Sequence, residues 1–187
     1  GVSAFVQHEA ACGVYHDYWL PSMSAPVALN LEWSDVEGKA HIPRDGESEG
    51  KIGLKWFGNP KFELEQHRLF PEHLMHDIFK DMDNIISLQK DGDSPDWMEK
   101  PSLETWKDTR RAVSKCDLVV TSCTAIAHLA GSMGVETYII IPLLPYYMWA
   151  LPGNKSPHYD SVTLFRQEKY GNWEDPFMKI KSKLNNF

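Results

Sequence analysis

The sequence predicts an α/β domain built around a mainly parallel β-sheet. From residue 51 onward, short apolar segments alternate with longer amphipathic ones, which is the order expected of βαβ units. One of these segments, residues 117–122 (DLVVTS), is compact and apolar, as parallel strands buried on both faces are. The chain of 187 residues is also long enough to bury one substantial core.

Five strands and four helices are expected in residues 51–187. The strands are predicted at residues 51–57, 84–88, 117–122, 136–141 and 162–165. The helices are predicted at residues 71–80, 103–114, 124–133 and 173–184. Gly134 follows the third helix directly, in the position where a residue with positive φ commonly ends a helix.

A domain boundary is predicted near residue 50. Residues 44–50 (RDGESEG) gather charge and glycine without an apolar anchor, and a strand pattern begins immediately after them. Upstream, residues 15–30 mix prolines and turn-forming serines with apolar side chains. Residues 1–50 are therefore interpreted as an irregular segment that precedes the domain and is too short to be a domain itself.

Charge, cysteine content and apolar stretches indicate which partners and which cellular compartment to expect. A formal net charge of −7 disfavours nucleic acid and anionic membrane surfaces as partners. The three cysteines, Cys12, Cys116 and Cys123, contain no CxxC pair, which argues against a disulfide framework and a structural zinc site and favours a reducing cytoplasm. Prolines interrupt the longest apolar stretch, residues 137–153, so no transmembrane segment is expected.

The junction at residues 122–128 (SCTAIAH) is the strongest candidate for a ligand site. In parallel sheets, ligands bind outside the carboxyl ends of the strands, and here a strand turns directly into a helix. The unpaired amides of the first helical turn suit a diphosphate, to which Thr124 could add a hydroxyl and His128 its ring. The alternative is that Thr124 only caps the helix and His128 belongs to the core.

Several segments resemble, in the same order, the donor-binding half of one group of glycosyltransferases. Residues 117–142 (DLVVTSCTAIAHLAGSMGVETYIIIP) are similar to D-L-V-I-S-V-D-T-A-x-A-H-L-A-G-A-L-G-x-P of heptosyltransferase-like enzymes and of transferases found beside tetratricopeptide repeats. The matching segments outside this motif are KIGLKWFGNP at 51–60, ISLQK at 86–90, SPHYDSVTLF at 156–165 and LFRQEKYGNW at 164–173. Together they span residues 51–173, about two thirds of the chain.

The resemblance implies a Rossmann-like, three-layer fold like the C-terminal half of a GT-B glycosyltransferase. It implies a nucleotide-diphosphate sugar as donor substrate, an unknown acceptor, and neither a metal nor a further cofactor. The residues implied to bind the donor are Gly58, Asn59, Gln89, Lys90, Cys123, Thr124 and Ala125. Arg68 and His128 are implied to act in catalysis, by neutralising charge on the departing diphosphate.

The chain departs from the family pattern in two ways. Cys123 stands where the family commonly has Asp, which puts the donor preference in doubt. Enzymes of this kind also have an N-terminal domain that supplies the acceptor site and usually the base, whereas residues 1–50 resemble only the crossover between the two domains. Asp17 and Asp35 are available carboxylates, but no motif marks either as the base.

The same sequence is compatible with other functions. A binding module that holds a nucleotide or nucleotide sugar without turnover fits the same residues, and a homo-oligomer could complete the cleft. Cys123 with His128 could form a cysteine hydrolase site. A pair at His73 and His76 has a metal-binding spacing, but no metal is expected because no other ligand completes the shell. The aromatic loop at 145–149 (PYYMW) is either a sugar-stacking wall or a cover on the sheet.

Overall fold

The computed structural model describes residues 13–21, 24–61 and 65–185. The chain divides into two compact units, Gly1–Val36 and Glu37–Phe187. Cys12 lies outside the described residues.

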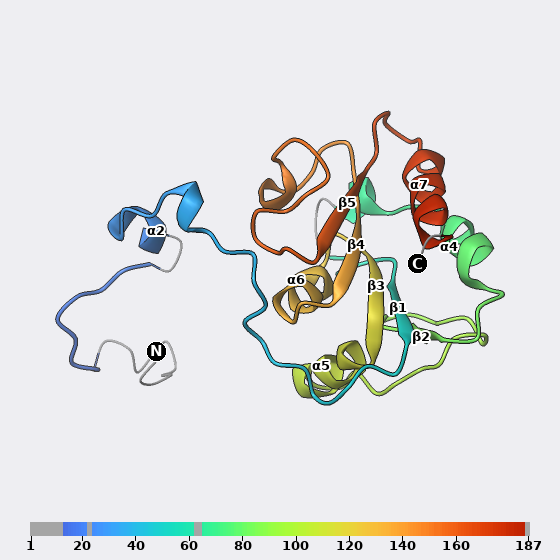
Figure 1. Ribbon diagram of the computed structural model, residues 1–187, viewed down its shortest axis with the longest axis horizontal. Coiled ribbons are helices and arrows are strands. Elements are labelled where there is room, and N and C mark those ends of the chain that lie inside the picture. Colours follow the sequence, from blue (N-terminus) through green and yellow to red (C-terminus); the bar gives the residue numbers. More distant parts are fainter. Residues whose placement is uncertain (1–12, 22–23, 62–64, 186–187) are drawn as a thin grey trace. The chain divides into compact units, whose positions relative to one another are not determined.

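A five-stranded sheet forms the centre of the second unit (Figure 1). Its strands are β1 (Lys51–Lys55), β2 (Ile85–Ser87), β3 (Cys116–Ser122), β4 (Glu136–Ile141) and β5 (Val162–Arg166). They run in the order β2-β1-β3-β4-β5, and every neighbouring pair is parallel. The chain therefore moves outward from β1 to β2 and then returns past β1 to β3, which makes the gap between β1 and β3 the switch point of the topology.

Helices cover both faces of the sheet, so the fold is the predicted three-layer, Rossmann-like α/β arrangement. Figure 1 places α4 (Glu72–Phe79) and α7 (Glu174–Leu184) on one face, and α5 (Trp106–Ser114) and α6 (Ala125–Ser132) on the other. Within the described residues of this unit, two short elements were not predicted, the helix α3 (Glu65–Arg68) and the 3-10 helix η3 (Tyr147–Trp149).

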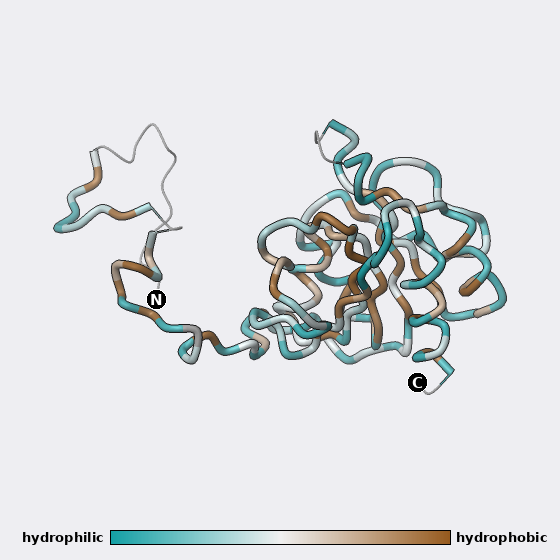
Figure 2. The backbone as a smooth tube through the Cα atoms, turned by 90° about the horizontal axis from the view of Figure 1, so that it is seen from above, coloured by the Kyte–Doolittle hydropathy of each residue, from teal (hydrophilic) through white to brown (hydrophobic). Residues whose placement is uncertain are grey.

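The side chains of the central strand β3 are buried on both faces of the sheet. Leu118, Val119 and Val120 are all fully buried. Because successive side chains of a strand point to opposite faces, Leu118 and Val120 pack in the core on the α4 and α7 side, while Val119 packs against α5 and α6. Figure 2 shows hydrophobic stretches of the chain gathered toward the centre of this unit.

The ends of the helices follow local capping rules. α5 begins at Trp106 rather than at the predicted residue 103, because Thr105 and Asp108 form a capping box in which each side chain accepts from the other's backbone amide. α6 is followed by Gly134 with a φ of 67°, as predicted. Within α6, Gly131 leaves room for an aromatic ring, since a Cβ atom there would lie 2.6 Å from Cγ of Tyr159.

Residues 37–50 pack against the sheet unit. The amides of His41 and Ile42 both donate to the carbonyl of Ser132, each at 2.9 Å. Asp45 forms an ion pair with Arg110 of α5. These contacts group residues 37–50 with the sheet, whereas composition alone placed the boundary near residue 50.

The described part of the first unit contains the short helix α2 (Ala25–Ala28) and the 3-10 helix η2 (Trp33–Asp35). No residue of α2 is buried. Large apolar side chains in this unit are exposed, including Tyr15, Tyr18 and Trp19. Across the described ranges of the whole chain, no helix has the length and apolar character needed to cross a membrane.

Replacing Leu118 by alanine is expected to lower the free energy of unfolding by about 2–5 kcal/mol, because it removes a fully buried side chain from the middle of the sheet and leaves a cavity. Urea unfolding measures the change. Met178→Ala on α7 is the control, since this side chain is 69% exposed and its loss should cost no more than about 0.5 kcal/mol. Equal losses in the two variants would contradict this description of the core.

Candidate functional site

Two adjoining pockets lie at the carboxyl ends of β1, β2, β3 and β4. The first, called here the Trp106 pocket, has a volume of about 510 Å³ and is lined by Lys55, Gly58, Asn59, Arg68, Leu88, Lys90, Asp91, Leu103, Glu104, Thr105, Trp106, Thr109, Thr124, Ala125 and Ile126. The second, the Tyr146 pocket, has about 730 Å³ and is lined by Asn59, His67, Arg68, Cys123, Thr124, Ala125, His128, Pro142, Leu144, Pro145, Tyr146 and Tyr147. Both volumes fall in the range typical of small-molecule sites.

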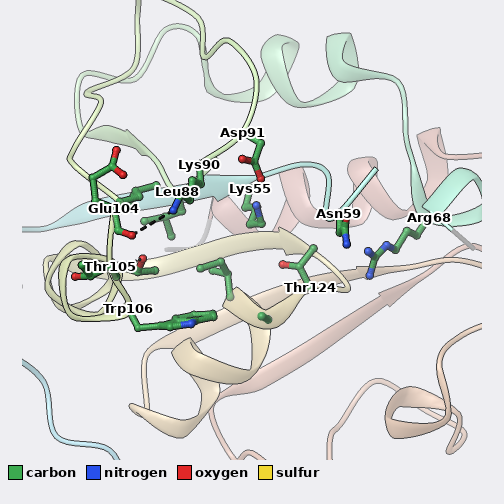
Figure 3. Close-up of a pocket in the computed structure, with 15 residues that line it drawn as sticks. Lys55, Asn59, Arg68, Leu88, Lys90, Asp91, Glu104, Thr105, Trp106 and Thr124 are labelled. Atoms are coloured by element: carbon green, nitrogen blue, oxygen red, sulfur yellow. Dashed lines mark hydrogen bonds between the residues drawn. The ribbon is translucent and has the colours of Figure 1, made fainter. Parts of the chain in front are cut away.

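The two pockets meet over the start of α6. They share four lining residues, which are Asn59, Arg68, Thr124 and Ala125. Figure 3 shows Lys55 and Thr124 between Trp106 on one side and Asn59 and Arg68 on the other. The crevice therefore runs past the switch point between β1 and β3, where the topology leaves room for a ligand.

The start of α6 presents unpaired backbone donors to this crevice. Thr124 is the N-cap residue with an extended backbone, and its hydroxyl lies 3.2 Å from that of Thr121 instead of capping the helix. Among the described residues, no group accepts a hydrogen bond from the amides of Ala125 or Ile126. Together with the helix dipole, these amides favour an anion at the junction of the pockets.

Arg68 is held in a buried ion pair. Its guanidinium group pairs with the carboxylate of Glu65, and Nη1 donates to the carbonyl of Cys123. Oε1 of Glu65 in turn accepts from the amide of Gly58 at 2.6 Å. This network, the Glu65–Arg68 clamp, ties the loop after β1 to the turn after β3, so the positive charge of Arg68 is matched before any ligand binds.

Glycine is required at position 58 for this clamp. A Cβ atom there would overlap the guanidinium group of Arg68 and lie 3.1 Å from Oε2 of Glu65. The predicted donor residue Gly58 thus has a packing role as well as a place in the Trp106 pocket, and its neighbour Asn59 lines both pockets.

His128 lines the Tyr146 pocket but is packed against aromatic rings. Its ring stacks on Trp149 with centroids 4.9 Å apart and planes at 24°. Nδ1 lies 3.1 Å from the hydroxyl of Tyr159. Burial, aided by the nearby His158, lowers the pKa of His128 below its ordinary value of 6.5, so at neutral pH the ring is uncharged. It can offer a ligand a hydrogen bond but no positive charge.

Gln89 and Lys90 are adjacent in the sequence, but only Lys90 lines one of the two main pockets. Gln89 is buried, and it joins the loop after β1 to the loop after β2 by accepting from the amide of Phe57 at 3.3 Å and donating to the carbonyl of Asp91 at 3.1 Å. It lines a smaller pocket of about 250 Å³ instead of the two main ones. Lys90 lines the Trp106 pocket, and its Nζ donates to the carbonyl of Glu104 at 3.2 Å (Figure 3).

The cysteine-hydrolase alternative finds no support in the geometry. Cys123 is buried, and burial raises the pKa of its thiol, whereas a nucleophilic cysteine needs a lowered one. His128 directs Nδ1 at Tyr159. In the described part of the chain, no group of three or more His, Cys, Asp or Glu side chains is arranged to hold a metal ion.

Lys55 and Trp106 are among the residues of the Trp106 pocket that the sequence analysis missed. Trp106 is the first residue of α5 and is 65% exposed, so a face of its indole is available at the pocket. Its position beside the capping residue Thr105 was the only local signal. Lys55 is the last residue of β1 and stands out as a charged side chain that is buried in the sheet.

Comparisons of the chain with protein-family models, with curated proteins and with solved structures gave no match.

Glu65→Ala is expected to lower the free energy of unfolding by about 3–5 kcal/mol, because it leaves the guanidinium group of Arg68 buried without its counter-ion. The double variant Glu65→Ala/Arg68→Met should regain most of this loss. Chemical denaturation of the wild type, both single variants and the double variant gives the coupling energy. Additive losses in the double variant would show that the clamp does not exist.

The lowered pKa of His128 predicts a pH-dependent loss of stability. Because the unfolded chain binds the proton more tightly than the folded protein, stability is full above pH 6.5 and falls as the pH drops below that value. NMR titration should place the pKa of His128 below 6.5, and His128→Gln should flatten the decline in unfolding free energy between about pH 7 and pH 5. A ring that titrates above 6.5 would contradict the buried, neutral histidine.

Proposed function

We propose that residues 37–187 bind a nucleotide-diphosphate sugar and act as the donor-binding part of a GT-B type glycosyltransferase. One observation carries the proposal: two pockets of different chemistry join over unpaired amides at the start of α6. A ligand with a diphosphate between two uncharged groups would match this arrangement. The resemblance of the sequence to heptosyltransferase-like enzymes supports the same ligand class.

The Trp106 pocket suits the nucleoside. The exposed face of Trp106 can stack on a base, and aromatic faces accept any base because each has a π surface. Charged and polar groups around the pocket, among them Lys90, Glu104 and Thr109, can hydrogen-bond the ribose or the edge of the base. Leu88, Leu103 and Ile126 supply apolar walls.

The Tyr146 pocket suits the sugar. Tyr146 and Tyr147 are half exposed, and their ring centroids are 4.4 Å apart. Aromatic faces pack well against the C–H face of a pyranose, while Asn59 and His128 can bond its hydroxyl groups. The diphosphate would then lie at the shared residues, above Thr124 and Ala125.

The residues present would act on the leaving group. In transfer, an acceptor hydroxyl attacks the anomeric carbon, the bond from that carbon to the diphosphate oxygen breaks, and the hydroxyl proton passes to a base. The amides of α6 and the hydroxyl of Thr124 would stabilise the charge that develops on the diphosphate. His128, being neutral, would contribute a hydrogen bond.

A non-catalytic binding module is the second candidate, and the lining of the Tyr146 pocket favours it. Among the described residues, no carboxylate lines this pocket. Its ionisable side chains are those of His67, Arg68, Cys123, His128, Tyr146 and Tyr147. A glycosyltransferase would therefore need a carboxylate base from outside these residues, whereas a binding module needs none.

Nucleotide binding is expected to raise the melting temperature of the protein in a panel of UDP, GDP, ADP and CMP and their sugars. A ligand at 100 times its Kd should add about 2.7 kcal/mol to the unfolding free energy. Trp106→Ala should weaken binding of any stabilising nucleotide by roughly tenfold, the loss expected for one stacked base, and Tyr170→Ala, an exposed tyrosine outside the pockets, serves as control.

Release of free nucleotide or transfer to added acceptors then separates the two candidates. Turnover of a stabilising nucleotide sugar supports the transferase, and stabilisation without turnover supports the binding module. If no nucleotide stabilises the protein, both are wrong.

A further inference from the structure

A single lysine is buried at the floor of the Trp106 pocket. Lys55 ends β1, beside the switch point with β3, and is only 9% exposed. It lines the pocket, and Figure 3 shows its side chain between the loop carrying Asp91 and the start of α6 at Thr124. Among the described residues, no hydrogen bond or ion pair reaches its Nζ.

Burying an ammonium group without a partner is costly, so such lysines are rare in a stable core. Lys51, at the opposite end of the same strand, shows the usual solution, because it pairs with Glu99 at 2.7 Å. Arg68, which also faces the crevice, is matched by Glu65. Lys55 is therefore the buried cation of the pocket that has no direct partner within the described structure.

We propose that Lys55 is a ligand-binding residue, whose ammonium group holds the anionic part of the molecule that enters the Trp106 pocket. The unpaired amides of Ala125 and Ile126 lie on the same pocket and would bind the same anion from a second side. The inference rests on the proposed function for the identity of that anion, a nucleoside diphosphate. It assigns to Lys55 the charge neutralisation that the family resemblance implied for Arg68.

The charges around Lys55 come from three neighbouring segments. Asp91 stands on the loop after β2, and Glu65 and Arg68 stand on α3, while Lys90 and Glu104 line the same pocket. Burial lowers the pKa of Lys55 to about 8, opposed by the negative charges of Asp91 and Glu65 and assisted by Arg68. At pH 7 the group is thus mainly protonated, and a bound anion would hold the proton more firmly.

This environment sets the sign of the pH dependence. Because the ligand prefers the protonated amine, its affinity is full below pH 8 and decreases as the pH rises through that value. Stability without ligand behaves in the opposite way. The unfolded chain binds the proton more tightly, at a pKa of 10.5, so the cost of burying the charge is present below pH 8 and disappears as the pH rises to 10.5.

Calorimetric titration with inorganic pyrophosphate tests the inference. We expect Lys55→Met to bind pyrophosphate at least tenfold more weakly than the wild type at pH 7. At pH 9.5 the two proteins should bind almost equally, and the ionisation of the probe itself cancels in this ratio. Lys55→Gln serves as a second variant in case the methionine protein does not fold.

Lys51→Met is the matched control, since it removes the same charge from the other end of the same strand. It should leave pyrophosphate affinity unchanged. Melting temperatures provide a readout that a purely structural lysine would not give. Without ligand, Lys55→Met should melt higher than the wild type because a buried charge is gone, whereas Lys51→Met should not, because it loses its ion pair with Glu99.

The outcomes separate this inference from the proposed function. If nucleotides bind and Lys55→Met keeps its affinity for pyrophosphate at pH 7, the role of Lys55 is overturned and the proposed function stands. If pyrophosphate binds in a Lys55-dependent way but no nucleotide binds, the inference stands and the proposed function fails. Failure of the wild type to bind pyrophosphate or any nucleotide overturns both.

Discussion

The buried ion pair between Glu65 and Arg68 determines the geometry of the crevice. It joins the loop after β1, through the amide of Gly58, to the turn after β3, through the carbonyl of Cys123. These two segments flank the switch point of the sheet, and each carries part of both pockets. Because the carboxylate of Glu65 already neutralises the guanidinium group, the first role of Arg68 is to hold these two segments together. The helix amides and Lys55 are then the groups that would bind an anion.

Local signals in the sequence were enough to predict the fold. The five predicted strands agree with the observed ones to within one or two residues at each end. A short apolar run such as DLVVTS is stable only as a strand that is buried inside the sheet. The start of α6 could be predicted for the same reason, since strand, turn and helix are contiguous in the chain. The short helix α3 was missed because its four residues carry no apolar period.

The site was less predictable, because its properties depend on partners that are distant in the sequence. The ring of His128 is neutral because Trp149 and Tyr159, from the loops between β4 and β5, enclose it. Lys55 ends β1 and Trp106 begins α5, and nothing in their own segments indicates that they share a pocket. The pairing of Arg68 was visible only as a spacing of three from Glu65, and spacing does not reveal burial.

The absence of a side chain at Gly131 affects the candidate site. The close approach of Tyr159 to α6 is possible only because this helical position has no Cβ atom. That approach brings the tyrosine hydroxyl to Nδ1 of His128 and occupies one of the two ring nitrogens. Only Nε2 is then left to meet a ligand in the Tyr146 pocket. The glycine at position 131, one helical turn from His128, thus determines which edge of the imidazole a bound molecule can contact.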